Sequence, residues 1–149
     1  MARTERKPTA SQEDYLEAIL ALVADGAEAR AGDIARRLGV SKPSVTGALK
    51  VLARRGWVRY EPYGRVELAD AGRRAAERVR RRHEVLRRFL ADIAGVEPSV
   101  ADANACRMEH VLDERAMQAV RHLTDFASHS PAGRRFVNAL AKARREEGA

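Results

Sequence analysis

Three residue types that bind transition metals stand close together near position 106 of this chain. Cys106, Glu109 and His110 occupy positions i, i+3 and i+4 of one segment. If that segment is helical, residues at these spacings share one face, so the three side chains can converge on a single ion. Thiolate, carboxylate and imidazole groups all bind divalent first-row metals. The segment therefore predicts part of a metal site that needs further ligands from elsewhere in the chain.

Each of these signals also has a simpler structural interpretation. A lone cysteine such as Cys106 is usually a small buried hydrophobic residue, and a Glu-His pair is usually solvated surface. His122 and His129 belong to no visible group of ligands, and we expect both at the surface.

Further donors are present on two other predicted helices. Asp14 and Glu17 are carboxylates at positions i and i+3 of the first predicted helix, and His83 stands midway along a long one. The carboxylates alone are equally consistent with acidic residues that stabilise a helix N-terminus.

The first 68 residues predict a winged helix-turn-helix. Apolar residues at helical spacing and capping residues predict helices, and a change to alternating residues predicts a hairpin. We expect helices over residues 9–25, 31–38 and 41–55 and strands over 57–61 and 65–68, with a turn over 62–64. These elements occur in the order and lengths of a winged helix-turn-helix.

The remainder of the chain predicts only helices. We expect helices over residues 70–93, 99–112, 113–126 and 134–145, and a loose arm over 1–8. The fold class is therefore mainly α, with a winged-helix DNA-binding domain over residues 1–70 and an all-helical domain over 71–149.

The third predicted helix has the polar face that a DNA-reading helix needs. Hydroxyl groups and free backbone N–H groups at a helix N-terminus bind phosphate oxygens. The candidate DNA-binding residues are Ser41, Lys42, Pro43, Ser44, Thr46, Gly47 and Lys50, with Arg65 at the tip of the wing. Because residues 42–49 contain no Arg, Gln or Asn, bidentate base contacts should be sparse, which favours readout of DNA shape. A solvated face, or a helix-turn-helix that docks on protein, would show the same pattern.

Composition narrows the function classes further. The 149 residues carry 28 Lys and Arg against 21 Asp and Glu, a formal charge of +7, which fits a polyanionic partner. An arginine-rich surface that results from high-GC codon usage would give the same surplus of positive charge. One cysteine excludes an intrachain disulfide, and we see neither a secretory signal nor a membrane-spanning run. We expect a cytoplasmic protein with no membrane partner.

Taken together, the motifs resemble the diphtheria toxin repressor family, including its manganese-transport-regulator branch. The resemblance covers residues 11–126 approximately. It rests on EDYLEAI (13–19), IARRL (34–38), SVT (44–46), RHEVL (82–86) and CRMEH (106–110).

The resemblance implies a winged helix followed by a helical dimerisation domain, with metal bound between the two. It implies a homodimer that binds a double-stranded DNA operator when loaded with Mn²⁺ or Fe²⁺ and represses metal-homeostasis genes. Zn²⁺ or Co²⁺ would also bind in vitro. The implied metal ligands are Asp14, Glu17, His83, Cys106, Glu109 and His110, for one or two ions per chain.

Some positions depart from the family pattern. The manganese branch has glutamate where this chain has Cys106, a residue typical of the iron branch, so the site is a hybrid. Arg87 replaces a carboxylate and Asp102 replaces a histidine of the iron branch's ancillary site, which therefore looks degraded. Gly47 replaces a base-contacting glutamine, so the iron branch's operator preference is not carried over.

Two other function classes remain open at this point. A regulator that senses an organic ligand would need an aromatic-lined pocket, and the second half has few aromatic residues. A hydrolytic metalloenzyme would need an open coordination position and a substrate cleft, and we expect no enzyme. Apolar residues of the later helices either form the dimer interface or fill the core of one chain: Val111, Leu112, Val120, Leu123 and Phe126.

Overall fold

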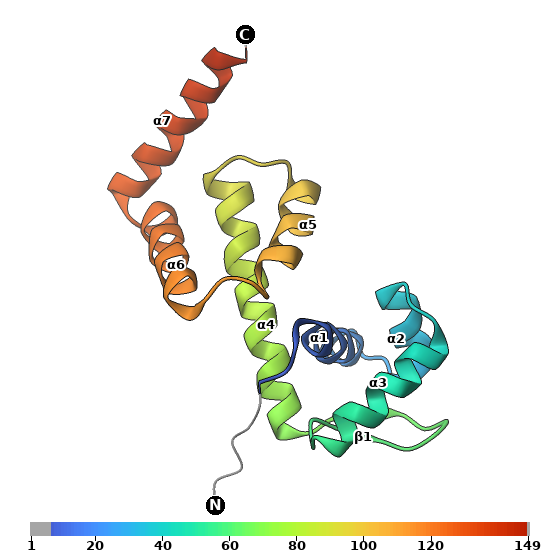
Figure 1. The fold of residues 1–149 in the computed structure, drawn as a ribbon. Coiled ribbons are helices and arrows are strands. Elements are labelled where there is room, and N and C mark those ends of the chain that lie inside the picture. The colour runs from blue at the N-terminus through green and yellow to red at the C-terminus, as the bar shows by residue number, and fades with distance from the viewer. Residues whose placement is uncertain (1–6, 149) are drawn as a thin grey trace, which may run out of the picture. The chain divides into compact units, whose positions relative to one another are not determined.

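The computed structural model describes residues 7–148, so most of the predicted arm over residues 1–8 lies outside the described part. The chain forms two compact units, Met1–Arg80 and Arg81–Ala149, and each is described here by itself. The helix α4 (Asp70–Arg88) begins in the first unit and ends in the second (Figure 1). The predicted boundary at residue 70 stays a prediction.

The first unit begins with a helix whose start is fixed by a capping box. In α1 (Ala10–Ala24), the Thr9 hydroxyl accepts from the Gln12 N–H at 3.3 Å, and the Gln12 side chain accepts from the Thr9 N–H at 2.9 Å. These two bonds satisfy N–H groups that a helix end leaves open. The apolar positions of α1 then enter the core: Tyr15, Leu16, Ile19 and Leu20.

The next two helices form the predicted helix-turn-helix. The chain turns at Gly39, whose φ of 65° is the left-handed conformation that glycine adopts without strain, after α2 (Ala31–Leu38). Ser41 then caps α3 (Lys42–Arg54), which has Pro43 in its first turn. The buried faces of both helices meet α1 in one core, where Ile34, Val45, Leu49 and Leu52 are fully buried.

A two-stranded hairpin completes the wing. β1 (Val58–Tyr60) pairs antiparallel with β2 (Val66–Leu68), with Tyr60 opposite Val66. The Val66 N–H donates to the Ala29 carbonyl at 2.7 Å, which attaches the hairpin to the loop before α2. At the tip, Tyr63 has a φ of 63° although it is not glycine. Gly72 of α4 lies so close to the Trp57 carbonyl that a Cβ would overlap it. The predicted winged helix-turn-helix is confirmed.

The second unit is helical throughout, and its helix ends differ from the sequence prediction. The predicted helix over residues 70–93 is α-helical only to Arg88, and a π-helical turn, η1 (Phe89–Ile93), follows. The next helix, α5 (Pro98–Met108), ends four residues before the predicted end at residue 112. Glu109 is its C-terminal cap, and His110 lies in the turn beyond it.

Two longer helices complete this unit. α6 (Glu114–His129) is capped by Asp113 and extends past the predicted end at residue 126. α7 (Pro131–Glu147) packs on α6 and begins before the predicted start at residue 134, with Ser130 as its cap.

The apolar residues suggested for the dimer interface fall into two sets. Leu112 and Val120 pack against the buried cluster of Leu86, Ala105 and Met117, so they belong to the core of the chain. By contrast, Val111, Leu123 and Phe126 have exposed fractions of 78%, 45% and 54%.

Candidate metal centre and DNA-reading surface

The polar face predicted for DNA reading is present on α3. Val45 and Leu49 are fully buried, while Ser41, Lys42, Pro43, Ser44, Gly47 and Lys50 are exposed. The Ser41 and Ser44 hydroxyls lie 2.7 Å apart, and the Thr46 hydroxyl donates to the Lys42 carbonyl at 3.1 Å. The face therefore offers short polar groups and the Lys42 ammonium group at the helix N-terminus, with Lys50 about two turns further along, a combination that suits phosphate oxygens.

A groove of about 340 Å³ separates α3 from the wing. On one side it is lined by Lys42, Thr46 and Lys50, and on the other by Tyr60 and residues 62–64. Arg30, which precedes α2, lines the same groove. The sequence prediction missed Arg30 and Tyr63, because only the fold brings the loop before α2 and the wing tip beside the recognition helix.

Arg65 lies on the wing, as predicted, but it has a protein partner in this structure. Its Nε is 2.9 Å from the Glu67 carboxylate, and both side chains are solvent-accessible. An exposed ion pair of this kind contributes at most about 1 kcal/mol, so a phosphate can replace Glu67 at little cost.

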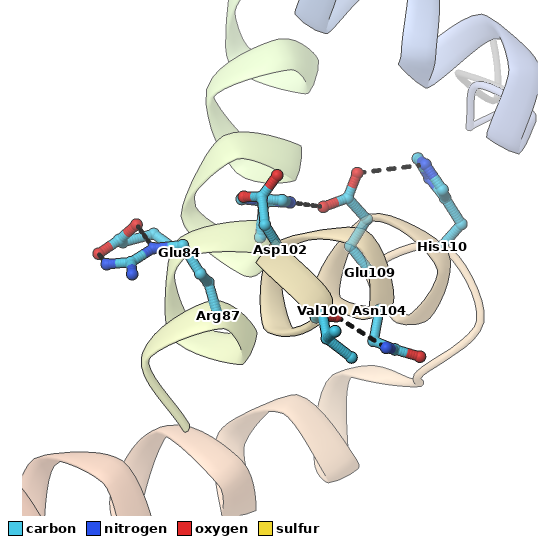
Figure 2. A network of polar contacts seen from close by, with 8 residues as sticks. Glu84, Arg87, Val100, Asp102, Asn104, Glu109 and His110 are labelled. Atoms are coloured by element: carbon cyan, nitrogen blue, oxygen red, sulfur yellow. Dashed lines mark hydrogen bonds and ion pairs between the residues drawn. The ribbon is translucent and has the colours of Figure 1, made fainter. Parts of the chain in front are cut away.

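The candidate metal centre of the second unit is built around His83 on α4. The His83 Nδ1 atom is 2.8 Å from Glu109 Oε2, and its Nε2 atom is 2.9 Å from Asp102 Oδ1. The Glu109 side chain is fully buried and the ring of His83 is 17% exposed, whereas Asp102 is 60% exposed. The ring thus lies between a buried and an exposed carboxylate (Figure 2 labels Asp102 and Glu109).

The two carboxylates change the protonation of this ring. Burial alone lowers the pKa of His83, but the hydrogen bond to Asp102 and the charge of Glu109 outweigh it and raise the pKa above its usual value. The ring of His83 therefore stays protonated to a higher pH than a free imidazole does.

Two further predicted ligands lie beside Glu109. His110 Nε2 is 3.3 Å from Glu109 Oε1, and Figure 2 shows the two side chains pointing toward each other. The ligand atoms of His83, Cys106 and Glu109 lie within 4.8 Å of one another, with Cys106 on the exposed side. The cysteine is therefore not the buried hydrophobic residue that a lone cysteine usually is.

A part-buried arginine fixes the turn that carries these ligands. Arg82 precedes His83 on α4, and its side chain is 15% exposed. Its Nε donates to the Glu109 carbonyl at 2.8 Å, its Nη2 donates to the Leu112 carbonyl, and Nη1 is 3.6 Å from the Glu114 carboxylate. Arg82 thus binds the carbonyl of the C-terminal cap of α5 and a second carbonyl in the turn that leads to α6.

Other residues of the sequence prediction are placed as follows. Asp14 and Glu17 lie on α1 in the first unit, so their part in the metal site stays a proposal. Arg87 makes a bidentate pair with Glu84, with contacts of 2.8 and 3.0 Å. This pairing gives Arg87 a structural partner at the position where the iron branch has a carboxylate ligand. His122 and His129 are exposed, as expected.

Comparison with protein families assigns both halves of the chain. The model for the iron dependent repressor N-terminal DNA binding domain matches residues 7–66. The model for the iron dependent repressor metal binding and dimerisation domain matches residues 69–137. In the described part of the chain, no helix has the length and hydropathy needed to cross a membrane.

Individual relatives agree with this assignment. The transcriptional regulator MntR of Escherichia coli O6:H1 is 39% identical over 112 residues, which are 75% of this chain and 72% of that protein. A solved manganese-dependent transcriptional repressor in complex with manganese is 30% identical and superposes with a TM-score of 0.70, over 77% of this chain and 53% of that one. The IdeR protein of T. acidophilum is 29% identical with a TM-score of 0.67, over 78% of this chain and 54% of that one.

The chain thus spans about half the length of these two solved structures. The winged helix, the helical second unit and the two family models agree on one assignment. The chain therefore belongs to the iron-dependent repressor family of metal-dependent, DNA-binding transcriptional repressors, as its sequence motifs predict.

Proposed function

We propose that this protein is a cytoplasmic, homodimeric repressor of metal-homeostasis genes in which Mn²⁺ or Fe²⁺ controls operator binding. The observation that carries the proposal is the convergence of imidazole, thiolate and carboxylate donors at His83, Cys106 and Glu109. His110, adjacent to Glu109, supplies a second imidazole. These donors fit a divalent first-row metal.

The donor set combines ligand types that prefer different metals. Carboxylate oxygens suit Mn²⁺ and Fe²⁺, whereas the Cys106 thiolate favours Fe²⁺, Co²⁺ and Zn²⁺. Affinity alone ranks Zn²⁺ above Mn²⁺ and Fe²⁺, so the metal supply of the cell decides between them. The manganese and iron relatives support Mn²⁺ or Fe²⁺ as the physiological ion.

In the proposed mechanism, the metal supplies positive charge at a buried carboxylate. Asp14 and Glu17, which the sequence resemblance adds to the ligand set, would contribute two further negative charges. In the metal-free protein, repulsion among these carboxylates and Glu109 disfavours their approach. A bound cation would neutralise these charges and remove that cost. The metal shifts the protein toward its DNA-binding state only if that state binds the metal more tightly than the other state does.

The DNA-binding side of the proposal uses the face of α3 and the groove beside it. Lys42, Lys50 and Arg30 place positive charge along the groove, where a sugar-phosphate backbone fits. Two copies in a dimer would present two such faces, which predicts two half-sites separated by about one or more helical turns of DNA. A coupling of about 1–3 kcal/mol between metal and DNA binding is typical of such switches.

The test is an anaerobic titration of the full-length apo protein with Mn²⁺ and with Fe²⁺, counting the ions bound per chain. His110→Ala removes a proposed ligand, and His122→Ala is the matched control because His122 is exposed on α6. DNA duplexes selected from a random library in the presence of Mn²⁺ then serve as the probe for fluorescence anisotropy, with metal and with a chelator.

One or two tight sites that are lost in His110→Ala and kept in His122→Ala would support the proposal. DNA affinity should then rise by about 5–150-fold with metal, the range that corresponds to the expected coupling. Weak binding that neither variant changes, or DNA affinity indifferent to metal, would refute it and favour a regulator that senses an organic ligand.

A further inference from the structure

Asp102 contacts His83, the proposed metal ligand on α4. The sequence comparison notes Asp102 only because it replaces an ancillary-site histidine of the iron branch. Asp102 lies on α5, one helical turn before Cys106, and accepts at 2.9 Å from the Nε2 side of His83. The other ring nitrogen, Nδ1, faces Glu109 at 2.8 Å. Each nitrogen of the ring therefore faces its own carboxylate.

The surroundings of the two nitrogens decide which one can bind metal. Nδ1 faces a fully buried carboxylate, and the ligand atoms of His83, Glu109 and Cys106 lie within 4.8 Å of one another. Nε2 faces Asp102, which is 60% exposed and thus stands on the solvent side. A neutral imidazole keeps its proton on one nitrogen and offers the lone pair of the other. The hydrogen bond that one nitrogen makes thus determines which nitrogen binds the metal.

We propose that Asp102 is a positioning residue of the metal centre, which holds the Nε2–H of His83 and thereby presents the Nδ1 lone pair to the ion. The proposal rests on the proposed function, because it needs His83 to be a ligand. It assigns Asp102 a role in a carboxylate–histidine–metal arrangement, in which an outer carboxylate fixes the tautomer and the orientation of the ring. Asp102 itself stays outside the coordination sphere.

The ring of His83 is held at both edges, by Glu109 at 2.8 Å from Nδ1 and by Asp102 at 2.9 Å from Nε2. It would not have to rotate to present Nδ1, so it is already oriented for an ion on that side.

The test uses the 149-residue protein and four substitutions, one of which, His83→Gln, removes the proposed ligand itself. Asp102→Ala removes the acceptor, and Asp102→Asn keeps a carbonyl oxygen that can accept from Nε2–H but removes the charge. Asp125→Ala, at an exposed position of α6, is the control for loss of one surface charge. Mn²⁺ affinity is measured by electron paramagnetic resonance. The protonation of the ring nitrogens is read from long-range ¹H–¹⁵N correlations of ¹⁵N-histidine protein loaded with Zn²⁺.

We expect Nε2–H with metal on Nδ1 at His83 in the wild type. Asp102→Ala should weaken Mn²⁺ binding by about tenfold, the low end for such outer partners because Asp102 is largely exposed, and should mix the two tautomers. Asp102→Asn should restore most of the affinity and the single tautomer, and Asp125→Ala should change neither.

Three results would overturn the proposal. One is metal on Nε2 in the wild type, and another is an Asp102→Ala protein with unchanged affinity and tautomer. The third is Asp102→Asn as weak as Asp102→Ala, since that result would make Asp102 a direct ligand. In each case the proposed function stands if His83→Gln still abolishes tight binding. If His83→Gln binds Mn²⁺ like the wild type, the proposed metal centre fails as well.

Discussion

Replacing Arg82 with alanine should loosen the turn that carries Glu109 and His110. Arg82 is the only described side chain shown to bind both the Glu109 and the Leu112 carbonyl, and it also faces the Glu114 carboxylate. The substitution removes both hydrogen bonds and leaves two carbonyl groups of the turn between α5 and α6 without that donor. Both the stability of the second unit and its metal affinity should therefore fall.

The magnitude follows from the contacts. A hydrogen bond with a charged partner contributes about 1.5–3 kcal/mol. The ion pair with Glu114, whose side chain is 60% exposed, adds about 0.5 kcal/mol at most. Water can reach part of the turn after the substitution, so we take the low end for both bonds and expect a loss of about 3 kcal/mol. For a chain of this size, that is a fall of about 6–12 °C in Tm.

Thermal unfolding of the apo protein, followed by circular dichroism, measures the loss, and hydrogen exchange at the Val111 and Leu112 amides locates it. Arg82→Lys keeps the charge but not the fork of donors, so it should lose about half as much. Glu114→Ala should change little. Arg115→Ala, an exposed arginine of α6, is the matched control. If Arg82→Ala unfolds like Arg115→Ala, with unchanged exchange at the two amides, the reasoning is refuted.

Four other changes have expected outcomes. Asp113→Ala removes the 2.8 Å bond to the Ala116 N–H and should cost about 1 kcal/mol in urea unfolding; no loss would contradict its role as a helix cap. Cys106→Ser should weaken Co²⁺ and Zn²⁺ binding more than Mn²⁺ binding in competition titrations, and an equal effect on all three would argue against a thiolate ligand. The raised pKa of His83 stabilises the apo fold fully below the unfolded value near 6.5, and this contribution is lost as pH rises through the folded pKa. Because the protonated ring cannot bind metal, Mn²⁺ affinity should fall as the pH is lowered through the raised pKa of His83, and a flat profile would exclude His83 as a ligand. Lys42→Ala should weaken binding to all DNA sequences and reduce the slope of log affinity against log salt by about 0.9, whereas an effect on one sequence only would indicate base contact.

The sequence predicted the first unit well because local signals and burial agree there. Thr9 and Ser41 cap their helices, Gly39 makes the turn, and the apolar residues at helical spacing are the ones that the core buries. His83, Cys106 and Glu109 were predicted from donor types and family motifs, and the structure of the second unit brings these three together.

The end of α5 shows what a sequence pattern leaves out. The apolar spacing continues through Leu112, so the helix was predicted to continue as well. In the structure, Arg82 binds the carbonyl groups of Glu109 and Leu112, and Asp113 caps the next helix. The two contacts of Arg82 join residues 27 and 30 positions apart, so the local spacing of apolar residues does not predict them. The contact between Asp102 and His83 was missed for the same reason.

The left-handed backbone of Tyr63 has a consequence for engineering this protein. A non-glycine residue at a φ of 63° costs about 1 kcal/mol, and glycine at the same position would relieve that cost. A redesign guided by stability alone would therefore replace Tyr63 with glycine, and a screen for thermal stability would select that variant. The aromatic ring, 95% exposed beside the groove, would be lost in the process. At the tip of the wing, a substitution that raises thermostability should therefore weaken DNA recognition.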